Sequence, residues 1–370
     1  MGQLYCAGIT LKTIKPRREF FSTRRKTINS KDITLFVRQM ASMLTAGIPI
    51  IQAFELIASG QTNLHFQERL ASIKTDVESG TAPSDALRKY PRLFNTLMCN
   101  LIQAGEQSGT LDTMLNRIAH YREKTEHLYA KVKKALLYPT AVIIVAVLVT
   151  AILMVFVVPQ FESLFQGFGA DLPFMTRIIV QFSHFIKAYI AVFLGAGVLF
   201  SIGILQLHKR SEEFAYFIDK LLLRLPIIGV LLTKAIIARF SRTFATTFAA
   251  GLPIVDALSA VSGATGNRVY AQTTLLIRDS IATGQSLQTA LKGSALFPPM
   301  ALQMIAIGEA SGTLENMLSN IADFYEAEVD TTVDNLHTLL EPVILIVLGL
   351  LIGGLIFAMY LPVFQLGKVI

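Results

Sequence analysis

The stretch AGIPI (residues 46–50) returns 204 residues later as AGLPI (residues 250–254). A second stretch, GEQSGTL (105–111), returns 203 residues later as GEASGTL (308–314). Two unlike motifs that recur in the same order indicate an internal duplication with a single-residue insertion or deletion. Each copy runs on into an apolar stretch, where Pro139 and Pro159 match Pro342 and Pro362 at the same shift of 203. The chain therefore consists of two units, each a polar region followed by a very apolar one.

Composition places much of the chain away from water. Hydrophobic residues make up 52% of the chain and charged residues 16%, against about 25% charged residues in soluble domains. Three segments, residues 139–159, 188–207 and 342–361, contain no Asp, Glu, Lys, Arg or His. A helix of about 20 residues crosses a hydrocarbon core of about 30 Å. The sequence therefore predicts three transmembrane helices, over residues 135–159, 188–207 and 342–361.

Basic residues near these segments predict their orientation. They cluster before the first segment and after the second, and only Arg177 and Lys187 lie between the two. An excess of Lys and Arg marks the cytoplasmic side. We therefore expect a basic N-terminal segment (1–30), a cytoplasmic domain (31–134), an outer loop (160–187), a connector with a second cytoplasmic domain (208–341) and an outer tail (362–370).

The two polar regions differ in charge. The first, counted to Lys134, has 20 Lys plus Arg against 11 Asp plus Glu, whereas residues 208–341 have 10 against 13. A basic region attracts either an acidic surface or anionic lipid headgroups. We expect the first domain to meet either the second domain or the membrane surface, and we expect no nucleic acid partner.

Each polar region is predicted to be a bundle of short helices. Residues 32–44 and 50–58 have apolar residues at helical spacing, and further helices are expected over residues 64–78, after Pro83, over 94–107 and from 108 towards the first membrane segment. The second copy repeats this plan over residues 240–341. No stretch has convincing strand alternation, so the predicted fold is an all-α membrane protein with two homologous helical bundles.

Glycine and proline are the predicted turn formers of both motifs. Gly47 and Gly251 suit a left-handed helix C-terminus, and Pro49 and Pro253 suit the first turn of the next helix. The glycines of the second motif are predicted to be structural or partner-interface residues, and Gly109 and Gly312 to adopt positive φ. The glycines of this motif in the two copies are Gly105, Gly109, Gly308 and Gly312.

The glutamates of the second motif lie near the predicted end of a helix. There the helix dipole disfavours an anion, so a cation should compensate Glu106 and Glu309. Arg38 and Arg242 occupy equivalent positions in the first helix of each copy. We hypothesise the ion pairs Arg38–Glu106 and Arg242–Glu309, which would hold the first helix against the turn. The alternative is that these residues face a partner protein.

The motifs of enzyme chemistry are missing from the sequence. It contains no phosphate-binding loop, no HExxH and no nucleophile elbow, so we expect neither an enzyme nor a cofactor. His120, Glu123 and His127 have a spacing that permits a metal site. A solvated, charged helix face explains them as well, and we expect no metal.

The membrane segments themselves favour anchoring over transport. They carry no ionisable residue, whereas solute pathways usually do, so a small-solute transporter is a weak alternative. Gly349 and Gly353 form a GxxxG pattern, and Gly197 and Ser201 a small-xxx-small pattern. Both patterns are typical of close helix packing, which predicts self-association.

Several of these motifs together resemble the PilC/GspF family of inner-membrane platform proteins. The resemblance covers residues 31–370 and rests on LFVRQMASMLTAGIPI, the two GExSGTL motifs, LPIIG, and PVILIVLGLLIGG followed by YLPVF. The basic segment before Asp32 is more similar to the PilC branch, which serves type IV pili, than to the branch of type II secretion.

The resemblance implies a six-helix bundle in each cytoplasmic domain and an oligomer in the bacterial inner membrane. It also implies contact with hexameric assembly and retraction ATPases, with pilin or pseudopilin subunits and with other inner-membrane assembly proteins. The chain would transmit the work of ATP hydrolysis to the insertion or removal of pilin. The same role in type II secretion is the nearest alternative.

Overall fold

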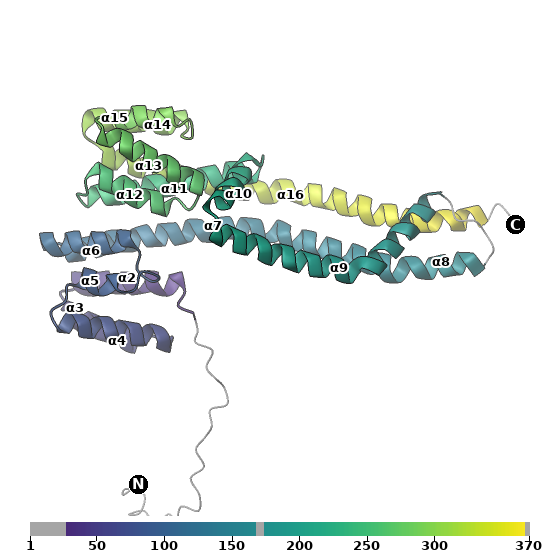
Figure 1. Ribbon diagram of the computed structural model, residues 1–370, viewed down its shortest axis with the longest axis horizontal. Coiled ribbons are helices and arrows are strands. Elements are labelled where there is room, and N and C mark those ends of the chain that lie inside the picture. The colour runs from purple at the N-terminus through teal and green to yellow at the C-terminus, as the bar shows by residue number, and fades with distance from the viewer. Residues whose placement is uncertain (1–26, 168–173, 367–370) are drawn as a thin grey trace, which may run out of the picture.

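The computed structural model describes residues 27–167 and 174–366. Within those ranges every regular element is a helix, which confirms the all-α prediction. Figure 1 shows two helical bundles next to each other at one end of the molecule and long helices that extend from them as a rod. The bundles and the rod share two helices, α7 (Leu111–Ile152) and α16 (Leu314–Leu366).

The first bundle contains six helices, separated by turns rich in glycine, proline and asparagine. The helix predicted over residues 64–78 has those bounds in the structure, whereas α6 begins two residues later than predicted. Asn95 caps α6, because its side chain accepts a hydrogen bond from the Met98 amide at 3.0 Å. Before α7 the helices are α2 (Ser30–Thr45), α3 (Ile50–Ser59), α4 (Leu64–Glu78), α5 (Pro83–Arg88) and α6 (Thr96–Ser108).

The second bundle repeats this order of helices. Its first helix is longer than α2, since it begins 12 residues before the predicted start at residue 240. Before α16 the helices are α11 (Ile228–Ala249), α12 (Ile254–Ala264), α13 (Arg268–Ala282), α14 (Leu287–Gly293) and α15 (Pro299–Ser311). Six helices in each bundle agree with the expectation from the family resemblance.

Equivalent aromatic residues form the centre of each bundle. Phe36 of α2 contacts Phe94 with ring centroids 5.8 Å apart, and it also contacts Phe54 and Phe66. In the second copy Phe240 contacts Phe297 at 4.8 Å. These rings are almost fully buried. The shared centre is the structural counterpart of the sequence repeat.

Helix α7 contributes to both hydrophobic cores. Its first turns place Leu115 and Ile118 in the core of the first bundle. About three turns later Leu128 and Ala135 lie in the core of the second bundle, against α11 and α16. The two bundles are therefore joined by a helix that both of them need for packing, and neither is an independent unit.

The rod contains the predicted membrane segments. By length and composition, the helical stretch over residues 111–163 is able to cross a membrane. Helices α10 (Glu212–Arg224) and α11 would qualify only as one bent pair, but they meet at 111°, and α11 is packed into the second bundle. The predicted segments 188–207 and 342–361 lie within α9 (Phe174–Arg210) and α16. Three membrane helices remain a prediction.

A π-helical turn, η1 (Leu153–Val157), interrupts the first predicted segment and leads into α8 (Val158–Gly167). Pro159, two residues after this turn, has no N–H and so removes one helical hydrogen bond there. The hydroxyl of Ser183 on α9 donates a hydrogen bond to the Met154 carbonyl within this turn. Around it, Met154 and Val158 pack with Val180 of α9 and Leu355 of α16. The region predicted as an outer loop, residues 160–187, is helical wherever the structure describes it.

Candidate functional site in the duplicated turns and the junction of the bundles

The second motif forms the turn between the last two helices of each bundle. Gly109 and Gly312 end α6 and α15 with φ of +69° each, a conformation that favours glycine. The Thr110 amide donates to the Gly105 carbonyl at 2.9 Å across this turn. The hydroxyls of Ser108 and Thr110 lie 2.7 Å apart, and those of Ser311 and Thr313 lie 2.6 Å apart. The two turns are therefore alike down to their side-chain bonds.

The first glycine of the motif has a different purpose. A Cβ on Gly105 would lie 3.0 Å from the Leu111 Cα and 2.9 Å from the Met114 Cγ. A Cβ on Gly308 would lie 3.0 Å from the Leu314 Cα. Both glycines thus allow the long helix to pass close to the helix before it. Gly105 and Gly308 were predicted as structural or partner-interface residues, and the structure gives them a role in close helix packing.

The glutamates of the motif hold the start of a short neighbouring helix. Glu309 accepts hydrogen bonds from the amides of Leu287 at 2.8 Å and Gln288 at 3.0 Å, at the first turn of α14. Glu106 accepts from the Ser84 amide at 2.7 Å and from the Ser84 hydroxyl at 2.6 Å, at the first turn of α5. Pro83 stands where the second copy has Leu287 and has no N–H, so the Ser84 hydroxyl replaces the missing donor.

The predicted pairs Arg38–Glu106 and Arg242–Glu309 are wrong. The carboxylates are already compensated by the helix N-termini just described, which carry positive dipole ends. Arg38 instead pairs with Glu123 of α7, with Nε to Oε1 at 2.6 Å and a second bond from Nη2. Arg242 donates from Nε to Glu326 of α16 at 3.0 Å.

The correct pairs were visible in the repeat. Glu326 follows Glu123 by 203 residues, the same shift that relates Glu309 to Glu106. Each first helix is therefore tied to the long helix of its own bundle by an equivalent arginine–glutamate pair. The hydrogen bond from Arg38 lowers the pKa of Glu123 below its ordinary value.

Arg242 has more partners than Arg38. It also binds Asp323 through Nη2 and donates from Nη1 to the Ser319 hydroxyl at 3.2 Å. Burial opposes its charge, but these bonds outweigh that cost and the pKa of Arg242 is raised. Lys124 of α7 reaches the same glutamate, with 3.0 Å between its Nζ and the Oε2 of Glu326.

Opposite charges join the two bundles along α7 and α16. Besides the Lys124–Glu326 contact, Lys131 pairs with Asp330. The Thr243 hydroxyl of α11 donates to the Tyr121 phenol oxygen of α7 at 3.3 Å. Of the two expectations for the basic first domain, the structure shows contact with the acidic second domain. Glu123 is bound to Arg38, which accounts for the central member of the His120–Glu123–His127 set.

The first motif forms the turn after the first helix of each bundle. Gly47 has φ of +80° and Gly251 has φ of +81°, as a left-handed turn requires. Pro49 and Pro253 directly precede the next helix and serve as its N-cap, one position earlier than expected. In the second copy this turn also packs on the other bundle, because Ala250 and Leu252 lie against the first core.

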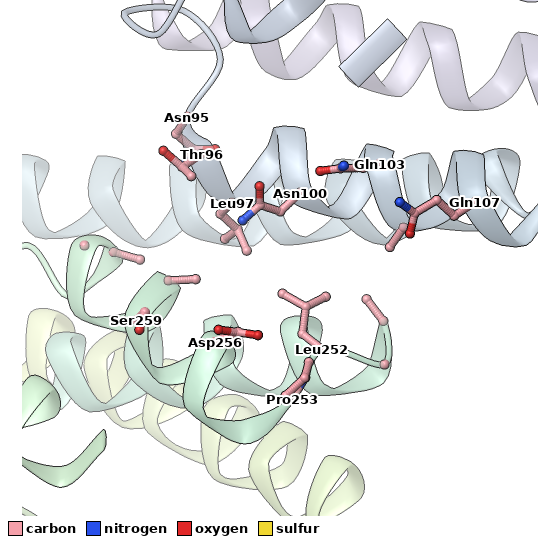
Figure 2. Close-up of a pocket in the computed structure, with 16 residues that line it drawn as sticks. Asn95, Thr96, Leu97, Asn100, Gln103, Gln107, Leu252, Pro253, Asp256 and Ser259 are labelled. Atoms are coloured by element: carbon pink, nitrogen blue, oxygen red, sulfur yellow. The ribbon is translucent and has the colours of Figure 1, made fainter. Parts of the chain in front are cut away.

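A groove of about 770 Å³ lies between the two bundles, bordered by α6 and α12 (Figure 2). Asn100, Gln103 and Gln107 of α6 line it, as do Asp256 and Ser259 of α12. Its described lining includes one carboxylate and no basic residue. This groove is a hydrogen-bonding surface at the bundle junction. Both motifs contribute to its lining, through Gln107 of the second motif and Leu252 and Pro253 of the first, but neither motif predicted a groove.

The GxxxG glycines lie on an open face. Nothing that the structure describes would come within 4 Å of a Cβ built on Gly349 or Gly353. The same is true of Gly197. The close packing predicted for Gly349 and Gly353 is therefore not made with any residue that the structure describes.

The chain matches the family model described as type II secretion system (T2SS), protein F, over residues 36–159 and 240–362. The type IV pilus assembly protein PilC of Pseudomonas aeruginosa is 51% identical over 93% of this chain and 92% of that protein. TapC, a type IV pilus assembly protein of Aeromonas hydrophila, is 44% identical over 96% and 86%. The type II secretion system protein F of Pseudomonas aeruginosa is 30% identical over 94% and 86%. The two matched ranges coincide with the two copies of the repeat. The chain therefore belongs to the PilC/GspF family, whose family model is described as type II secretion system protein F.

Proposed function

We propose that this chain is the inner-membrane platform protein of a type IV pilus assembly machine. The observation that carries the proposal is a contrast between two relatives from one organism. The pilus assembly protein of Pseudomonas aeruginosa is 51% identical to this chain, whereas the secretion protein F of the same organism is 30% identical. The platform is an assembly component and not an enzyme.

The membrane arrangement proposed for it has three helices, with the N-terminus in the cytoplasm and the C-terminus in the periplasm. Both bundles then lie on the cytoplasmic side, which the basic residues before residue 135 and after residue 207 favour. A reporter fused after Ile370 tests the number of crossings. We expect an alkaline phosphatase fusion there to be active and a green fluorescent protein fusion to be dark. The reverse result would place the C-terminus in the cytoplasm and contradict three membrane crossings.

The bundles are the proposed contact surface for the hexameric assembly and retraction ATPases. The α7 helix supports this role, since it belongs to both bundle cores and continues into the first membrane segment. A displacement of the bundles would therefore move the membrane helices, on which pilin subunits would be inserted or withdrawn. The open glycines of α16 are the proposed contact between copies of this chain in a homo-oligomer.

The decisive test is a deletion strain complemented with the full chain. Surface pili are counted by electron microscopy, and exported enzymes are assayed in the medium. We expect pili to be lost and secretion to be unchanged, with pili restored by the complementing copy. Loss of secretion with normal pili would assign the chain to type II secretion instead, and solute uptake by the purified protein in liposomes would point to a transporter.

A further inference from the structure

A cavity of about 860 Å³ lies where the first bundle meets α11, close to the start of the first predicted membrane segment. It is bordered by the beginning of α2, by the middle of α7 and by Arg239 of α11. In Figure 1 the beginning of α2 lies at the end of the first bundle nearest the rod. The lining residues that determine its chemistry are Lys31, Tyr129, Lys133, Lys134, Leu137 and Arg239.

The lining is strongly basic. Lys31, Lys133, Lys134 and Arg239 contribute four positive charges, and Glu126 is the one carboxylate among the lining residues that the structure describes. None of the four cations forms an ion pair with a described carboxylate, in contrast to Lys124 and Lys131 on the same helix. The cavity therefore has an uncompensated positive charge.

Arg239 is the most constrained of these cations. Its Nε is buried and has no hydrogen-bond partner among the described residues. Its Nη1 makes one long bond of 3.4 Å to the Thr265 carbonyl, and a Cβ on the neighbouring Gly266 would lie 2.2 Å from that nitrogen. Burial lowers the pKa of Arg239, and the groups that act against this are phenols, Tyr121 and Tyr129. A half-buried guanidinium with no anion beside it among the described residues is costly, and it marks a place for an anion.

Two large apolar side chains of α7 also line the cavity, four residues before and four residues after Lys133. Tyr129 and Leu137 are 61% and 64% exposed. Leu137 lies two residues before Pro139, where the uncharged membrane segment begins. On a helix that enters a bilayer, this position is the level of the lipid headgroups. Basic pockets at this level on the cytoplasmic side are suited to anionic headgroups.

We propose that this cavity binds the phosphate headgroup of an anionic phospholipid from the cytoplasmic leaflet. The lysines and Arg239 face the phosphate, and Tyr129 and Leu137 lie beside the first part of the acyl chains. Because Asn29, Ser30 and Arg239 come from different bundles, the bound lipid bridges the two bundles at the membrane surface. The proposal rests on the membrane arrangement given above.

The test measures lipid retention by native mass spectrometry on the purified full-length protein in detergent. Phosphatidylglycerol and phosphatidylcholine are supplied separately, and the variant Lys133→Gln/Lys134→Gln is compared with wild type. We expect phosphatidylglycerol to be retained selectively. Each cation near a membrane surface changes affinity about fivefold, so the double variant should bind about 25-fold more weakly. The matched control Arg92→Gln/Lys292→Gln removes two exposed cations elsewhere and should bind as wild type does.

A second arm separates a lipid site from a site for a soluble anion. Thermal unfolding of the delipidated protein is followed in millimolar inorganic phosphate and in chloride of equal ionic strength. We expect phosphatidylglycerol to raise the midpoint and inorganic phosphate to have little effect, with Arg239→Gln reducing the lipid response. A response to phosphate alone, equal retention of both lipids, or wild-type binding by the double variant would each overturn the proposal. Piliation is not a readout here, so failure of this inference is distinct from failure of the proposed function.

Discussion

The two copies of the repeat hold the same arginine in very different surroundings. The Arg38 side chain is 36% exposed, and its partner Glu123 is 43% exposed. The Arg242 side chain is 8% exposed, and Glu326 is 16% exposed and also contacts Lys124 of the other bundle. Duplication explains why both pairs exist. Only the second pair lies at the junction between α7, α11 and α16. The helices that meet there shield Arg242 and Glu326 from solvent, whereas Arg38 and Glu123 have no such cover.

The largest difference is expected when each arginine is replaced by methionine. Arg242→Met leaves the largely buried Glu326 with Lys124 as its remaining cation among the described residues, and breaking a buried pair costs about 3 kcal/mol. Arg38→Met breaks a pair that is more than a third exposed, so the loss should stay below about 1 kcal/mol. Urea unfolding of both purified variants in one detergent measures the contrast, and equal losses would contradict it.

A smaller effect is expected from the close-packing glycines, and here the two copies should agree. Gly105→Ala and Gly308→Ala each place a Cβ about 3.0 Å from the backbone of the next helix. Overpacking of this kind costs about 1 to 3 kcal/mol. Thermal unfolding of the two variants should give similar shifts. A large shift of the unfolding midpoint in one copy alone would show that contacts at the bundle junction also affect how closely the two helices pack at that turn.

The second glycine of the motif should cost less, because only its backbone conformation is at stake. Gly109→Ala and Gly312→Ala meet no atom within 4 Å, but both positions have φ of +69°. A left-handed residue with a side chain costs about 1 to 2 kcal/mol. The same unfolding measurement should rank these variants below the Gly105 and Gly308 variants. Ser108→Ala, which keeps the glycine, serves as the control within the same turn.

The smallest expected effect is the pH dependence of the exposed pair. The pKa of Glu123 is lowered by its bond from Arg38, so its contribution to stability is present above the ordinary glutamate pKa of about 4.3. That contribution is lost as the pH falls through the lowered value. The difference in unfolding free energy between wild type and Glu123→Gln should be constant near neutral pH and shrink below about pH 4. The exposed Glu315→Gln is measured beside it as the control for removal of one carboxylate, and a pH-independent difference for Glu123→Gln would contradict the assignment.

Local pattern was enough to predict most helices. Apolar residues at helical spacing, with glycine or proline between the runs, gave the five short helices of the first bundle within a few residues. The left-handed conformation of Gly109 and Gly312 followed from the same local chemistry. Helix bounds and glycine conformations depend on residues that are neighbours in sequence, so one sequence is enough to predict them.

Long-range partners were beyond local pattern. Glu106 was assigned a cation because its own helix ends nearby, but the start of α5, 22 residues earlier in sequence, satisfies it instead. Arg38 and Glu123 are 85 residues apart, and only their common recurrence in the second copy links them. The sharing of α7 between two cores was equally hidden, since helical periodicity shows which face is apolar but not which bundle covers it.

Because α7 and α16 run from the bundle turns into the membrane segments with few interruptions, each couples the angular orientation of its two ends. One residue added to an α-helix turns everything beyond it by about 100° and moves it about 1.5 Å along the axis. The single-residue difference between the copies falls between Leu87 and Phe94, in the connection from α5 to α6, and the shift of 203 is unchanged from there to Pro159. In the proposed membrane arrangement, the way the first turns of α7 and α16 pack in the bundles therefore determines which side of each helix faces lipid. A bundle that rotates about the helix axis would turn that side within the bilayer.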